Sequence, residues 1–139
     1  MSVASGHRPS CIVAVMDTAR GLIVVMLGSA LGGGARWLAQ QWATRTFVTL
    51  LPVGTIAINI IGSFVLVLVL QAPSLSSTTR LFLTTGVLGG FTTYSSFNAE
   101  TILLLQDGHA GHAIGNVVVT VVACLVAGGV AVALGRGWR

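Results

Sequence analysis

The chain has few charged residues and no lysine. Charged side chains make up 7% of its 139 residues: seven arginines on the basic side, and Asp17, Glu100 and Asp107 on the acidic side. About a quarter of the residues of an average soluble domain are charged. With a mean hydropathy of +0.92, this chain lacks the polar surface that a soluble domain needs.

Cysteines and clustered basic residues are also scarce. Cys11 lies near the start and Cys124 in the last apolar stretch, so no disulfide framework is expected. The arginines occur singly, mostly at the ends of apolar stretches, which favours membrane anchoring over nucleic-acid binding. The sequence has no Ser/His/Asp arrangement, metal-ligand cluster or lysine-containing phosphate loop, so we predict that the protein is not an enzyme.

Four stretches of the sequence are long and apolar enough to cross a bilayer. A transmembrane helix needs about 18 or more mostly apolar residues. The stretches are residues 21–43, 53–70, 81–105 and 113–135. They predict an all-α integral membrane protein with four transmembrane helices, a multi-pass protein of the cell (plasma) membrane that is surrounded by lipid.

The predicted domain organisation follows from these stretches. One four-helix transmembrane domain covers residues 20–136, between a flexible N-terminal tail at residues 1–19 and a short C-terminal end at residues 137–139. The apolar run within the tail is too short to span a bilayer. Met16 offers an alternative start for the natural product.

The third apolar stretch differs from an ordinary transmembrane helix in its middle. Between positions 84 and 98, eight of fifteen residues carry a hydroxyl or amide group: Thr84, Thr85, Thr92, Thr93, Tyr94, Ser95, Ser96 and Asn98. Three glycines lie among them, and each glycine costs a helix about 1 kcal/mol relative to alanine. Serine and threonine also bond to nearby backbone in non-helical conformations. The pattern predicts a helix broken at mid-membrane, and such a break must be buried in protein or line a polar path.

Polar side chains in the second and fourth stretches recur at a spacing of four residues. Thr55, Asn59 and Ser63 share one face of the second helix, and Asn116 and Thr120 share one face of the fourth. A polar group at membrane depth is expensive unless it is paired. Two interpretations of Asn59 remain open: an interhelical hydrogen bond, or a donor that faces an ion path.

The first stretch combines small residues with one arginine. Gly28 and Gly32 are four residues apart, a spacing that lets helices approach closely in lipid. Arg36 and Trp37 then suit a membrane interface. Arg36 is therefore either an interfacial anchor beside a packing face or a vestibule residue that attracts anions.

The polar groups of the third stretch favour an anion over a cation. Glu100 is the only carboxylate embedded in any of the four stretches, whereas hydroxyl and amide donors are plentiful. Tyr94 and Phe97 lie three apart on one helical face, and aromatic rings carry a partly positive edge. A helix N-terminus at the break would attract an anion as well. Four short helices are too few to enclose a pore, so a channel of this kind needs a second subunit.

Three segments resemble signature blocks of the Fluc (CrcB-like) family of fluoride ion channels. They are GGGARW at 32–37, PVGTIAINIIGSF at 52–64 and GVLGGFTTYSSFNAE at 86–100. The resemblance covers roughly residues 21–135. It implies an antiparallel, dual-topology dimer of four-helix subunits that exports fluoride passively from the cytoplasm through two pores.

The resemblance also implies roles for single residues. Asn59 matches the pore asparagine, and Tyr94 and Phe97 match two ring positions that the family fills with phenylalanine. Gly89 and Thr92 match positions whose backbone carbonyls hold a structural sodium ion (Na+) at the dimer centre. The family's polar track corresponds to Ser95, Ser96, Glu100, Asn116 and Thr120. Tyr94 departs from the family in carrying a hydroxyl, and Asn116 stands where the family has a tyrosine.

The distribution of arginines bears on the partner subunit. Five of the seven, at positions 8, 20, 80, 136 and 139, are predicted on one side of the membrane, and Arg36 and Arg45 toward the other. This bias places both termini in the cytoplasm. The partner is therefore either a second copy of the chain, giving a homodimer, or an oppositely oriented paralogue.

Two other functions fit four short membrane helices. A small multidrug-type dual-topology transporter needs a carboxylate in its first helix for proton coupling, and residues 21–43 contain none. A structural membrane subunit would use its polar residues for packing alone. The density of hydroxyl and amide groups in the third stretch exceeds what packing requires, which favours the channel.

Overall fold

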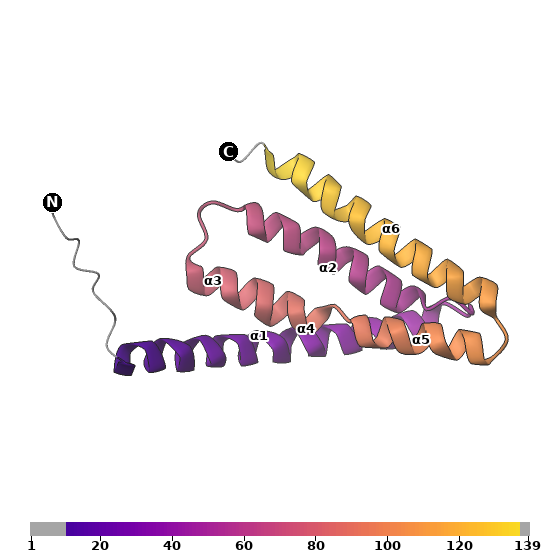
Figure 1. Ribbon diagram of the computed structural model, residues 1–139, viewed down its shortest axis with the longest axis horizontal. Helices are drawn as coiled ribbons and strands as arrows, with labels where there is room; N and C mark the ends of the chain where they lie inside the picture. Colours follow the sequence, from indigo (N-terminus) through magenta and orange to yellow (C-terminus); the bar gives the residue numbers. More distant parts are fainter. Residues whose placement is uncertain (1–10, 137–139) are drawn as a thin grey trace, which may run out of the picture.

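The described part of the chain, residues 11–136 with side chains from residue 17 onward, is helical throughout, apart from short connections. In this computed structural model the elements are α1 (Cys11–Thr46), α2 (Val53–Gln71), α3 (Ser77–Leu81), the π-helix η1 (Phe82–Leu88), α4 (Gly89–Phe91), α5 (Tyr94–Gln106) and α6 (Ala110–Gly135) (Figure 1). The predicted all-α class is confirmed for these residues.

Three helices within the described residues are long and apolar enough to cross a membrane. They are Asp17–Thr46, Val53–Gln71 and Ala110–Gly135, and they correspond to the first, second and fourth predicted stretches. The third stretch is divided among α3, η1, α4 and α5. The chain is a multi-pass membrane protein, and its helical segments fit the four that the sequence predicts.

The N-terminal boundary differs from the prediction. Helix α1 begins at Cys11, so residues 11–19, predicted as part of a flexible tail, are helical. The segment 11–20 contains neither proline nor glycine, and an existing helix extends readily through such residues. The rest of the predicted tail, residues 1–10, and the predicted C-terminal end, residues 137–139, lie outside the described residues.

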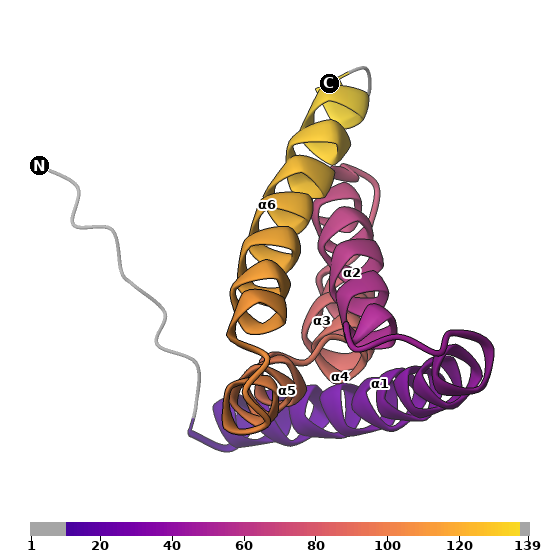
Figure 2. The same ribbon diagram turned by 90° about the vertical axis from the view of Figure 1, so that its right-hand side faces the viewer.

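The helices form two groups. Helix α1 packs along η1 and α4, and α2 packs along α6 (Figure 1). Figure 2, a view turned by 90°, shows α2 and α6 standing side by side above α1, with α5 below α6. Helix α5 also contacts α6. The junction between α4 and α5 therefore lies where the two groups meet.

Glycines allow α1 to approach η1 closely. A Cβ atom added to Gly28 would lie 2.8 Å from the Cα of Gly86, and one added to Gly32 would overlap the carbonyl oxygen of Val87. Backbone atoms cannot move aside as the end of a flexible side chain can. The predicted packing role of Gly28 and Gly32 is confirmed by this contact.

We expect Gly32→Ala to destabilise the protein. The added methyl group meets backbone of η1, and overpacking of this kind typically costs about 1–3 kcal/mol. Gly34→Ala is the matched control, because nothing lies within 4 Å of a Cβ at Gly34. Thermal unfolding of the purified proteins in detergent compares them. The packing interpretation is wrong if both variants unfold at the temperature of the parent chain.

Candidate functional site

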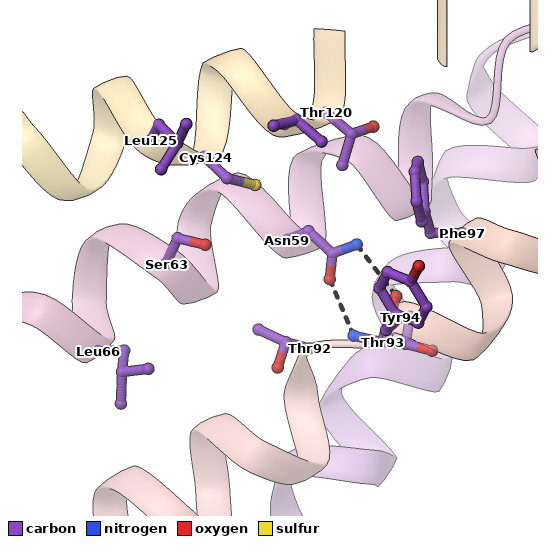
Figure 3. Close-up of a pocket in the computed structure, with 11 residues that line it drawn as sticks. Asn59, Ser63, Leu66, Thr92, Thr93, Tyr94, Phe97, Thr120, Cys124 and Leu125 are labelled. Atoms are coloured by element: carbon purple, nitrogen blue, oxygen red, sulfur yellow. Dashed lines mark hydrogen bonds between the residues drawn. The ribbon is translucent and has the colours of Figure 1, made fainter. Parts of the chain in front are cut away.

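The backbone between α4 and α5 is extended and is held by one side chain of α2. Helix α4 ends at Phe91, and Thr92 (φ −78°, ψ 156°) and Thr93 (φ −149°, ψ 110°) precede α5. The Asn59 Nδ2 donates to the Thr93 carbonyl at 3.1 Å, and the Thr93 N–H donates to Asn59 Oδ1 at 2.8 Å (Figure 3). The amide of Asn59 thus satisfies both backbone groups of Thr93.

Two backbone carbonyls lose their helical donors at this junction. In a continuous helix the Thr93 N–H would donate to Gly89, and the Ser96 N–H would donate to Thr92. The Thr93 N–H donates to Asn59 instead, and the Ser96 N–H donates to the Thr93 side-chain oxygen at 3.2 Å. The carbonyls of Gly89 and Thr92 are therefore available to other partners.

Thr93 is also the N-cap of α5. Its hydroxyl accepts the Ser96 N–H and donates to Ser96 Oγ at 2.9 Å. A side-chain cap of this type stabilises a helix N-terminus by about 1 kcal/mol. The N-terminus of α5, which carries a partial positive charge, is therefore fixed beside Asn59.

A cavity of about 380 Å³ lies next to this junction. Figure 3 shows its lining, which comes from α2, the junction, α5 and α6. The lining residues are Asn59, Ser63, Leu66, Thr92, Thr93, Tyr94, Phe97, Thr120, Val121, Cys124 and Leu125. A mostly apolar wall with a few polar groups is typical of a site for a small ligand. We call this space the central cavity.

The two aromatic rings of the central cavity lie close together. The ring centroids of Tyr94 and Phe97 are 5.6 Å apart, and the ring planes are inclined by 54°. Phe97 is buried at 8% exposure, whereas Tyr94 is 78% exposed. Phe97 is therefore fixed by its own chain, and the Tyr94 ring extends beyond it.

Arg36 and Ser96 meet at a second, smaller cavity. The Arg36 Nε donates to the Gly90 carbonyl at 3.1 Å. A cavity of about 190 Å³ is lined by Gly33, Arg36, Trp37, Gln40, Thr93 and Ser96. The Arg36 guanidinium therefore lies beside the α4–α5 junction. We call this space the arginine cavity.

Glu100 lies at a third cavity. The Thr55 hydroxyl donates to Glu100 Oε1 at 2.7 Å, and the Gln40 Nε2 donates to the same oxygen at 3.4 Å. The cavity measures about 220 Å³, and Gln40, Thr44, Thr49, Gly54 and Glu100 are among its lining residues. Its outer wall is the connection between α1 and α2. We call this space the glutamate cavity.

Asn116 lies between two helices and lines none of these cavities. It is 0% exposed, its Nδ2 donates to Thr101 Oγ1 at 2.8 Å, and its Oδ1 accepts from the Thr120 hydroxyl at 3.3 Å. Of this pair only Thr120 reaches the central cavity. Ser95 and Gly89 also lie outside the three linings, and both are exposed.

Comparison with known proteins decides the family. The family model described as "CrcB-like protein, Camphor Resistance (CrcB)" matches residues 23–135. The chain belongs to this family. It is 48% identical to the fluoride-specific ion channel FluC of Anaeromyxobacter sp. (strain K) over 110 residues, 76% of this chain and 87% of the relative. It is 45% identical to the protein of the same name from Sorangium cellulosum (strain So ce56), over 73% of this chain and 84% of the relative.

The CrcB-like match confirms the family resemblance drawn from the sequence. The matched region contains all three signature blocks. The relatives are named as ion channels, and the CrcB-like chain is accordingly not an enzyme, as the sequence predicted.

Two residues of the CrcB-like site were given no specific role by the prediction. Thr93 lies at the centre of the hydrogen-bond network, and Gln40 lines two of the three cavities. Both had a signal in the sequence. Thr93 lies three residues before Ser96 at the start of a helix, the spacing of an N-cap contact. Gln40 lies four residues after Arg36, on the same face of α1.

Proposed function

We propose that this CrcB-like chain is a fluoride-selective ion channel that exports fluoride passively from the cytoplasm. One observation supports this most strongly: the Asn59 side chain fixes an extended junction beside a cavity that contains two aromatic rings. The relatives' shared name, fluoride-specific ion channel, supports fluoride as the ion.

The central cavity offers a dehydrated anion only neutral or partly positive groups. The edges of the Tyr94 and Phe97 rings are partly positive, and the hydroxyl of Ser63 on the cavity lining can donate to an anion. The capped N-terminus of α5 adds its dipole. Fluoride leaving water at this point exchanges hydration for these contacts. Arg36 attracts it at the vestibule, and the polar track of Ser96 and Glu100 leads to and from the rings.

We place the α4–α5 junction at mid-membrane, within a third crossing that runs from α3 to α5. Lipid cannot satisfy backbone groups that a break exposes. Here Asn59 and the Thr93 hydroxyl satisfy three of these groups, the N–H and carbonyl of Thr93 and the N–H of Ser96. This arrangement supports a break that faces protein and a polar path.

A partner subunit in antiparallel orientation completes the pores. Polar residues rarely face acyl chains because their burial in hydrocarbon is costly, yet Ser95 and Asn98 are exposed on α5. The Tyr94 ring is also largely uncovered. A second copy of the chain, or an oppositely oriented paralogue, would cover this surface and close the central cavity.

The donor set at the junction fits a structural sodium ion. Unwound backbone carbonyls at broken helices coordinate Na+ in other membrane proteins, and hard cations prefer oxygen ligands. The carbonyls of Gly89 and Thr92 have lost their helical donors, and Gly89 is exposed. Two copies would hold the ion with these four carbonyls. When bound, Na+ supplies a fixed positive charge between the two pores.

Cys124 tests whether fluoride passes through the central cavity. The thiol lies on the cavity wall, so adding a methylthio group there is expected to narrow the path. In liposomes that contain the purified chain, we expect fluoride efflux before treatment. After treatment with methyl methanethiosulfonate, the efflux rate is expected to fall by more than half.

The control is Cys124→Ser, which retains Cys11. Efflux from Cys124→Ser liposomes is expected to be unaffected by the reagent. Mass spectrometry verifies the modification of the parent chain. A fully modified parent chain with unchanged efflux would exclude the central cavity from the path, and absence of efflux before treatment would exclude the proposed function itself.

A further inference from the structure

Gln40 separates two of the polar cavities. Its side chain, half-buried on α1, lines both the glutamate cavity and the arginine cavity. Thr93 in turn lines both the arginine cavity and the central cavity. The three cavities thus form a series, and Gln40 lies at the step from the α1–α2 connection toward Arg36.

The amide of Gln40 takes part in holding the carboxyl group of Glu100. Gln40 Nε2 lies 3.4 Å from both Glu100 Oε1 and Thr55 Oγ1, and the Thr55 hydroxyl donates to the same carboxylate oxygen at 2.7 Å. Glu100 Oε2 is buried, without a hydrogen-bond partner in the described part of the chain. Only the Oε1 side of this carboxyl group is therefore fixed.

Gly54 on α2 leaves the space that Gln40 occupies. A Cβ atom at Gly54 would lie 2.7 Å from Gln40 Oε1 and 2.9 Å from the Ala43 Cβ. The amide is therefore packed against α2 in one orientation, with its N–H groups toward Thr55 and Glu100. Packing of this kind locks the rotamer of a polar side chain.

We propose that Gln40 is a positioning residue of the fluoride pathway. It holds the Glu100 carboxyl group against α2, at the step between the glutamate and arginine cavities. Without the Gln40 amide, the Glu100 carboxylate would keep only the hydrogen bond from Thr55, and its less compensated negative charge would repel an anion passing between these cavities. This inference rests on the proposed function, because it assumes that the chain conducts fluoride.

The test measures fluoride efflux from liposomes that contain the full-length chain. Gln40→Met keeps the length of the side chain and removes the amide, and we expect at least a tenfold slower efflux. Gln41→Met is the matched control at the next position, which lines neither cavity, and it is expected to conduct at the parent rate. The double variant Gln40→Met/Glu100→Gln removes the freed charge and is expected to conduct several times faster than Gln40→Met.

The outcomes distinguish a positioning role of Gln40 from a role in packing alone. Parent-rate efflux through Gln40→Met overturns the inference, as does a double variant no faster than the single one. A parent chain that does not conduct contradicts the proposed function instead. If Gln40→Met does not fold, Gly54→Ala displaces the amide while keeping its chemistry. Slow efflux through that variant, relieved by Glu100→Gln, supports the inference, and parent-rate efflux overturns it.

Discussion

Asn59→Asp is expected to slow fluoride efflux by at least about a hundredfold. The substitution removes the Nδ2 donor to the Thr93 carbonyl and places a negative charge on the wall of the central cavity. Repulsion between an aspartate and fluoride at about 4 Å is about 4 kcal/mol at an effective dielectric constant of about 20. Each 1.36 kcal/mol added to a barrier slows a rate about tenfold. The measurement is the initial efflux rate from liposomes, recorded with a fluoride electrode.

Gln106→Glu controls for the added charge. Gln106 is the last residue of α5 and is exposed, away from the lining of the central cavity. We expect this variant to conduct at close to the parent rate. If Asn59→Asp also conducts at that rate, Asn59 does not face the fluoride path, and the interpretation of this residue as a purely structural hydrogen-bonding group is the correct one.

Phe97→Ile is expected to slow efflux by at least about tenfold, equivalent to about 1.4 kcal/mol in the barrier. Isoleucine remains apolar but has no partly positive ring edge to face the anion. Phe97 is buried on the wall of the central cavity, with its ring centroid 5.6 Å from that of Tyr94. Phe97→Ile therefore removes a group that stabilises the anion and leaves the cavity wall apolar.

Phe64→Ile is the control for a general effect of exchanging phenylalanine. Phe64 is half-buried on α2 and lies outside the lining of the central cavity. Thermal unfolding of both variants in detergent verifies that each is folded. Equal efflux rates for the folded Phe97→Ile and parent chains would remove this ring from the pathway.

Much of the helical architecture could be predicted from the sequence because it depends on local composition. The long apolar stretches gave the second and fourth helices to within three residues at each end. The predicted start of the first helix was wrong because an apolar stretch marks the part of a helix that contacts lipid. The helical backbone can begin before that part. The π-helical turn η1, in which Gly86 lies against Gly28 of α1, had no signal of its own in the sequence.

The candidate site could be predicted only in part, since much of it depends on contacts between helices. Asn59 and Phe97 were singled out by their residue types, and they do share a cavity. The clamp of Asn59 on Thr93 joins residues 34 positions apart, and no local pattern specifies it. Asn116 illustrates the opposite case: its polarity suggested a pathway residue, but Thr101 and Thr120 satisfy its amide inside the protein.

In the proposed function, the junction held by Asn59 gives a dehydrated fluoride ion a path across the membrane. The most direct measurement compares fluoride and chloride efflux from liposomes that contain only the purified parent chain. We expect rapid release of fluoride and retention of chloride. Retention of fluoride, or equal release of both ions, would contradict the proposed function.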